Sequence, residues 1–192
     1  MIILGIDPGT ASTGYGVIKT KEGCQSTNVS QLKGALECLE YGLIKTEPTL
    51  ATGHRLKKLN SELSKMIKRF RPEVLVVESL FFFKNFKTAI PVSQASGVVF
   101  FTAAKNNVPA YTLTPPQVKM TIAGHGRAEK EEVQQIMKKL LNLKEIPKPD
   151  DAADALAIAL TYFLKNNLLT LQCDSESTLR KSKGLTKSVE KI

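Results

Sequence analysis

The spacing of apolar and polar positions predicts strands in the first part of the chain. Residues 2–6 (IILGI) form an apolar run too short for a helix, so they predict a buried strand that ends at Asp7. Pro8-Gly9-Thr10 is a turn signal, and the apolar run after it predicts a strand that pairs with the first as a hairpin. The elements expected here are this second strand over 14–19, a long exposed turn over 20–34 and a third strand over 36–45.

Helical spacing replaces strand spacing after residue 50. Large apolar residues recur at steps of three and four, which is the pattern of an amphipathic helix, and Pro72 ends it. These residues are Leu56, Leu59, Leu63, Met66, Ile67 and Phe70. The run VLVV before Glu78 has no alternation and predicts a strand buried on both faces. The remaining expected elements are a helix over 91–106, a strand over 108–113 and helices over 117–122, 129–141 and 151–164.

This order of elements predicts an α/β fold with one mixed sheet and an antiparallel hairpin at one side of it. It differs from the regular alternation of a doubly wound sheet. Residues 1–170 are expected to form a single folded domain. Residues 171–192 are rich in serine and lysine with few large apolar residues, so a basic, disordered tail is predicted there.

Composition narrows the class of protein. The chain has 192 residues, of which 42% are hydrophobic and 23% charged, as expected for a soluble globular domain. It contains neither an apolar run long enough to span a membrane nor a basic segment of the kind that opens a signal peptide. The three cysteines, Cys24, Cys38 and Cys173, lack C-x-x-C spacing, which favours reduced thiols and a cytoplasmic location.

The charge balance indicates a polyanionic partner. The formal net charge is +9, and most of this surplus lies before the predicted tail. Such a surplus favours nucleic acid or an anionic membrane surface, although solubility alone can also explain it.

Four acids stand where a strand or helix makes an acid unexpected. Asp7 and Glu78 each follow a predicted buried strand, and Asp151 and Asp154 open the last helix three residues apart, on one face. If the first and fourth strands are parallel neighbours, Asp7 and Glu78 emerge together at one end of the sheet. A helix packed nearby can then present Asp151 and Asp154 to the same point.

Such a cluster needs a cation, because two unit charges about 4 Å apart repel by about 4 kcal/mol at an effective dielectric constant near 20. Oxygen ligands without histidine or thiolate favour Mg²⁺ or Mn²⁺, and two such ions can clamp a phosphodiester during hydrolysis. Each acid also has a simpler explanation: Asp7 can start a turn, and Asp151 and Asp154 can cap or open a helix. Glu78 is the hardest to explain in this way, because it ends a core strand.

Several motifs in order resemble the RuvC-type Holliday-junction resolvases, also called crossover junction endodeoxyribonucleases. These motifs are GIDPGT…TGYGV at 5–17, VVESLFF at 76–82 followed by Lys84-Asn85, QASGV at 94–98, PPQVK at 115–119 and AEK…DDAADALAIA at 128–159. The resemblance spans residues 1 to about 165. It implies a ribonuclease H-like fold, a five-stranded mixed sheet flanked by helices.

The resemblance also implies an activity. Members of this family are homodimers that bind four-way DNA junctions and nick two strands symmetrically, in recombination and DNA repair. The implied reaction is two-metal phosphodiester hydrolysis that leaves 5′-phosphate and 3′-hydroxyl ends, with two Mg²⁺ per active site and Mn²⁺ able to substitute. Association with a branch-migration motor is implied as well.

The residues that match the family's acidic positions are Asp7, Glu78, Asp151 and Asp154, which the resemblance makes metal ligands and catalytic groups. Asp7 would bridge the ions, while Glu78 and Asp154 would each hold one. Asp150 precedes the matched acid and is left as a helix-capping candidate. DNA contacts are expected from Phe81, Lys84, Lys119, Arg127 and Lys130.

Three alternatives stay open on the residues alone. An actin-like ATPase or sugar kinase shares a loop like GIDPGT but needs a second lobe and a second phosphate loop, for which the chain is short. A non-catalytic junction-binding protein on the same fold would have no use for clustered carboxylates. A sister nuclease could act on RNA–DNA hybrids or single strands, and the sequence does not show which cleavage site is preferred.

Overall fold

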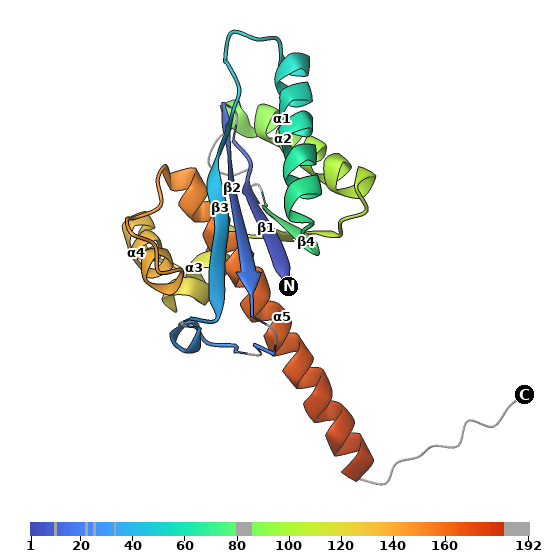
Figure 1. Ribbon diagram of the computed structural model, residues 1–192, viewed down its shortest axis with the longest axis vertical. Helices are drawn as coiled ribbons and strands as arrows, with labels where there is room; N and C mark the ends of the chain where they lie inside the picture. The colour runs from blue at the N-terminus through green and yellow to red at the C-terminus, as the bar shows by residue number, and fades with distance from the viewer. Residues whose placement is uncertain (10, 22, 25, 33, 80–85, 183–192) are drawn as a thin grey trace, which may run out of the picture.

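A five-stranded mixed sheet forms the centre of the molecule (Figure 1). The computed structural model describes the backbone of residues 1–9, 11–21, 23–24, 26–32, 34–79 and 86–182, and their side chains except at 86–88 and 169–182. The strands are Ile2–Asp7 (β1), Ser12–Thr20 (β2), Leu36–Lys45 (β3), Val74–Glu78 (β4) and Ala110–Leu113 (β5). Their order in the sheet is β3-β2-β1-β4-β5, with β1, β2 and β3 antiparallel and β1, β4 and β5 parallel. The predicted mixed sheet with its hairpin at one side is confirmed.

Helices cover both faces of this sheet, with α1 and α2 on one face and α3, α4 and α5 on the other (Figure 1). The helices are Thr52–Phe70 (α1), Phe86–Lys105 (α2), Pro115–Ala123 (α3), Lys130–Leu140 (α4) and Asp150–Ser182 (α5), with a short 3₁₀ turn at Val29–Gln31 (η1). Helix α2 begins five residues before its predicted start, so Pro91 lies inside it. Helix α5 runs to Ser182, and the domain boundary predicted after residue 170 falls within it.

The two faces of the central strands build two separate cores. In β4, Val74 and Val76 pack among α3, α4 and α5, whereas Leu75 and Val77 pack among α1 and α2. Strand side chains alternate between the faces, so a strand that is apolar throughout must be covered on both sides. The prediction made from VLVV is therefore confirmed.

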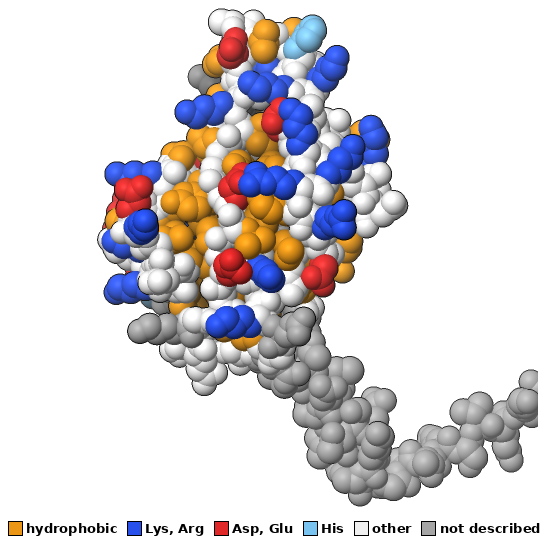
Figure 2. Space-filling view, in the orientation of Figure 1, with side chains coloured by type: hydrophobic (Ala, Val, Ile, Leu, Met, Phe, Trp, Pro, Cys, Tyr) orange, Lys and Arg blue, Asp and Glu red, His pale blue; other side chains and the backbone are white. Residues whose placement is uncertain are grey.

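Helix α1 is amphipathic as its spacing predicted. Leu59, Leu63 and Ile67 are buried against the sheet, while the lysines of the helix are exposed. Figure 2 shows Lys and Arg side chains spread over this side of the molecule, with acidic side chains among them. Arg71 ends the helix in the left-handed conformation, with φ of 49°.

The connection between β2 and β3 was predicted to be an exposed turn, but part of it is buried. Leu32 is fully buried and packs with the core beneath α5. Asn167 of α5 donates hydrogen bonds to the backbone carbonyls of Cys24 and Ser26, at 3.3 and 3.0 Å. One buried leucine and one amide thus attach this polar segment to the last helix.

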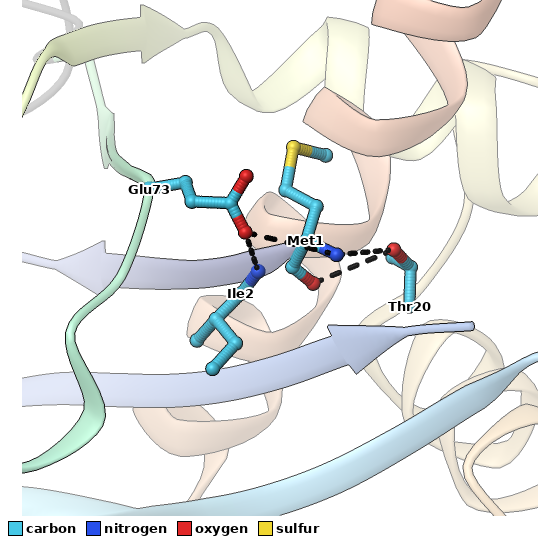
Figure 3. A network of polar contacts seen from close by, with 4 residues as sticks. All are labelled: Met1, Ile2, Thr20 and Glu73. Carbon is cyan, nitrogen blue, oxygen red and sulfur yellow. Dashed lines mark hydrogen bonds and ion pairs between the residues drawn. The ribbon is translucent and has the colours of Figure 1, made fainter. Parts of the chain in front are cut away.

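Polar contacts hold the beginning of β1 in place (Figure 3). The Ile2 N–H donates to Glu73 Oε1 at 3.0 Å, and the Met1 ammonium lies 3.7 Å from the same oxygen. The ammonium also donates to Thr20 Oγ1 at 3.2 Å. These contacts join the beginnings of β1 and β4 to the end of β2.

Glycines let α5 lie directly on the sheet. A Cβ added to Gly5 of β1 would collide with the Ala155 carbonyl, and one added to Gly14 of β2 would collide with the Asp151 carbonyl. Helix and strands therefore touch through their main chains at these points. The same helix carries two of the four acids, so this contact determines where they stand.

Candidate active site

Parallel pairing of β1 with β4 brings the first two acids together. Ile6 is the partner of Val77, so Asp7 and Glu78 are the next residues of two adjacent strands and leave the sheet at the same end. Their carboxyl groups form a hydrogen bond with each other. The prediction that Asp7 and Glu78 lie side by side at one end of the sheet is confirmed.

The start of α5 supplies the other two acids. Asp154 lines a cavity of about 240 Å³ together with Asp7 and Glu78. Asp151 is close enough to Asp7 to raise its pKa by repulsion, although it does not line this cavity. The structure therefore brings all four acids to one end of the sheet, from three separate segments.

Two lysines complete the rim of this cavity. Lys119 of α3 lines it, and Lys130 at the start of α4 lines it with its ammonium 3.3 Å from Asp154 Oδ2. Both residues were predicted as DNA contacts, and both lie beside the acids. Their positive charges partly offset the carboxylates, as the pKa values show.

Burial and mutual repulsion make these acids hard to ionise. Burial, then repulsion from Glu78, Asp154 and Asp151, raises the pKa of Asp7 from 3.8 to about 8. Burial and repulsion from Asp154 raise the pKa of Glu78 from 4.5 to about 7, against the opposing effect of its hydrogen bond with Asp7 and of the two lysines. Burial also raises the pKa of Asp154, against the attraction of Lys130. At neutral pH the site thus holds protons that a bound cation would displace.

Hydrogen bonds distinguish Asp150 from Asp151. Gln134 of α4 donates to Asp150 Oδ1 at 2.9 Å, which directs this acid to the neighbouring helix. Ser12, the first residue of β2, donates its hydroxyl proton to Asp151 Oδ2 at 2.9 Å. Sequence reasoning missed Ser12, because a serine at the start of a strand carries no signal of its own.

The other predicted DNA contacts stand apart from this arrangement. Arg127 is exposed in the connection between α3 and α4 and does not line the cavity. Phe81 and Lys84 lie outside the described residues.

The donor set suits a hard cation, because the acids offer carboxylate oxygens alone. In the described part of the chain, no group of three or more histidine, cysteine, aspartate or glutamate side chains stands ready-made as a metal site. Asp7 is bonded to Glu78 and Asp154 to Lys130 instead. A bound cation would compete with these contacts for the carboxylate oxygens.

A family profile described as crossover junction endodeoxyribonuclease RuvC matches residues 3–162, which includes all four acids. The chain belongs to the RuvC family. It is 44% identical over 174 residues to the RuvC of Caldicellulosiruptor saccharolyticus, covering 91% of this chain and 99% of that one. It is 47% identical over 162 residues to the RuvC of Ruminiclostridium cellulolyticum, covering 84% and 91%. As a member of this family the chain is a metal-dependent endodeoxyribonuclease.

Solved RuvC structures have the same architecture. The Thermus thermophilus RuvC structure matches with a TM-score of 0.76 at 38% identity, covering 88% of this chain and 96% of that one. The same protein in complex with a Holliday junction substrate matches with a TM-score of 0.79. The ribonuclease H-like fold that the RuvC resemblance implied is confirmed. Among the described residues, none of the helices is both long enough and apolar enough to cross a membrane.

Proposed function

We propose that Asp7, Glu78, Asp151 and Asp154 form the catalytic centre of an enzyme that resolves four-way DNA junctions by symmetric paired nicks. The observation that carries this proposal is the crowding of Asp7, Glu78 and Asp154 around one cavity at the end of the sheet, where the pKa of Asp7 rises to about 8. Such crowding destabilises the fold unless a cation enters. The junction as substrate is supported by the T. thermophilus RuvC complex with a Holliday junction.

We expect Mg²⁺ as the cofactor, two ions per active site, with Mn²⁺ able to substitute. The four carboxylates are the residues that would hold the ions, and the absence of histidine or cysteine from this set favours hard cations. Bound ions would activate the attacking water and stabilise the leaving 3′ oxygen of the phosphodiester.

The lysines act on the DNA. Lys119 and Lys130 line the same cavity as the acids, so a scissile phosphate entering it meets two ammonium groups. Asp154 would hold a cation in place of its ion pair with Lys130, and the Lys130 ammonium would then be available to contact phosphate. Arg127 and, from outside the described residues, Phe81 and Lys84 are proposed to contact DNA farther from the cut.

A homodimer accounts for paired cuts, because two sites related by a two-fold axis match a two-fold symmetric junction. The exposed side of α2 supports this assembly: Ile90 and Phe101 are 70% and 62% exposed, and Gly97 between them has open space around it. A second copy of α2 can approach closely there. Association with a branch-migration motor stays a prediction, to be tested by co-purification on junction DNA.

Cleavage of labelled synthetic junctions tests this function. Junctions with a mobile and an immobile core are compared with linear duplex and RNA–DNA hybrid, in Mg²⁺, Mn²⁺ and EDTA, with Asp7→Asn as the inactive control. Paired symmetric nicks that need the metal and disappear in Asp7→Asn are expected. Binding without nicks in either metal would leave a junction-binding protein, and faster cutting of the hybrid would point to a sister nuclease on the same fold.

A further inference from the structure

A second, smaller cavity lies beside the turn that follows β1. It measures about 70 Å³ and lies between the start of α1, the side of α2 and Gly9, which is two residues beyond Asp7. A single water needs roughly 10–15 Å³ measured in this way, so the cavity has room for several waters or for one tetrahedral oxyanion. It is separate from the cavity that holds the acids.

The groups around this cavity suit a phosphate. Among the described residues that line it there is one arginine, Arg55, together with three threonines and one glutamine, and no acid. The Arg55 Nε donates to Thr46 Oγ1 at 3.1 Å, which holds the guanidinium in place. The remaining N–H groups of a guanidinium can then bind two phosphate oxygens in parallel.

Thr13 adds a hydroxyl group to the wall of this cavity. It is only 3% exposed, and it lines the cavity. Its hydroxyl can donate a hydrogen bond to an oxygen of an anion that enters the cavity.

The start of α1 adds a third contribution. No side chain among the described residues caps this helix, and its first turn contains no acid. Free N–H groups and the positive end of the helix dipole therefore remain available for an anion beside Thr52.

We propose that this cavity binds a phosphate of the DNA backbone. This phosphate is the neighbour of the scissile phosphate on the strand that is cut. The inference rests on the proposed junction-cleaving function, and it adds a site that fixes how the strand lies across the end of β1. Gly9 joins the two sites, because the chain between it and Asp7 is a single proline. A strand whose scissile phosphate lies at Asp7 therefore has a neighbouring phosphate within reach of Arg55.

Junction binding in EDTA, where no cleavage occurs, tests this site. Arg55→Gln is expected to weaken binding about tenfold and to reduce the slope of log affinity against log salt by about 1, as loss of one phosphate contact does. Lys57→Gln is the matched control, since Lys57 is an exposed residue of α1 that does not line the cavity. Equal effects of the two substitutions would overturn the site. Failure of the unaltered protein to bind any junction would instead overturn the proposed function.

Thr13→Val separates binding from folding. Valine keeps the shape of threonine and removes only the hydroxyl, so the melting temperature is expected to stay the same or rise. Junction affinity is expected to fall by about two- to tenfold, the value of one hydrogen bond. An unchanged affinity in a stable Thr13→Val protein would contradict the proposal.

Junctions that carry a single uncharged methylphosphonate at successive positions identify the phosphate. One position beside the cut is expected to weaken binding by the unaltered protein and to have no further effect in Arg55→Gln. Inorganic phosphate distinguishes the other source of the same chemistry. The contrary result is that inorganic phosphate raises the melting temperature of the unaltered protein but not of Thr13→Val or Arg55→Gln. If, in addition, no methylphosphonate position has an effect that depends on Arg55, the cavity takes free phosphate and the DNA assignment is wrong.

Discussion

Asp7→Asn is expected to stabilise the metal-free protein while it abolishes cleavage. The pKa of Asp7 rises from 3.8 to about 8 on folding, and each unit of pKa difference corresponds to about 1.4 kcal/mol. Between pH 4 and pH 8 the unfolded chain loses the proton of this acid while the folded state keeps it. The free energy of unfolding therefore falls as the pH rises towards 8. At pH 8 the carboxylate thus costs up to about 5 kcal/mol, against less than about 2 kcal/mol at pH 5.

An asparagine at this position removes the charge but remains a buried polar group, so part of the gain is lost. We expect a net gain of about 2–3 kcal/mol at pH 8 in EDTA, which for a chain of this length raises the melting temperature by about 5–10 °C. At pH 5 we expect no gain. Addition of Mg²⁺ at pH 8 should stabilise the unaltered protein more than Asp7→Asn.

Thermal unfolding at pH 5 and pH 8, with EDTA or Mg²⁺, measures these differences. Glu62→Gln is the control for loss of one negative charge, because Glu62 lies on the surface of α1 and bonds to Lys65. An Asp7→Asn protein that is less stable than the unaltered one at pH 8 in EDTA would refute the reasoning. So would an equal gain at both pH values, since the cost of ionisation would then play no part.

Three further substitutions test the surroundings of the site. Gly5→Ala places a Cβ against the Ala155 carbonyl and should cost about 3 kcal/mol or prevent folding, whereas Gly53→Ala, which has open space on α1, should be neutral or stabilising in the same urea titration. Ser12→Ala removes the hydrogen bond to Asp151, so junction cleavage should need about tenfold more Mg²⁺, with Ser12→Thr restoring part of the loss and the circular dichroism spectrum unchanged. Thr161→Val replaces a fully buried hydroxyl that has no hydrogen-bond partner among the described residues, and should raise the free energy of unfolding by about 1 kcal/mol; a loss of stability would mean that the hydroxyl is satisfied.

The strands could be predicted from patterns that are local in the chain, and the meeting of Asp7 with Glu78 followed on the condition that β1 and β4 are parallel neighbours. An apolar run without alternation has to lie in the middle of a sheet, and acids that follow parallel neighbouring strands have to emerge together. The two helix acids are three residues apart, so their common face followed from helix geometry.

Contacts between distant segments could not be predicted in this way. The bond from Ser12 to Asp151 joins residues 139 positions apart, and neither residue type indicates the other. Leu32 lies in the segment predicted as an exposed turn, and it is buried because it packs into the core that α5 helps to form. The length of α5 was underestimated for a different reason: beyond residue 173 the composition is polar, whereas the helix continues to Ser182.

Main-chain contact between α5 and the sheet has a consequence for how the protein can vary. The separation between the acids on α5 and those on the strands is set by van der Waals contact of the main chains, since at Gly5 and Gly14 no side chain stands between helix and strand. Exchanges of one aliphatic residue for another elsewhere in the core can alter side-chain packing without altering this separation. Substitutions between aliphatic residues are therefore tolerated across most of the interior, whereas Gly5 and Gly14 cannot accept a side chain without moving α5 away from the sheet.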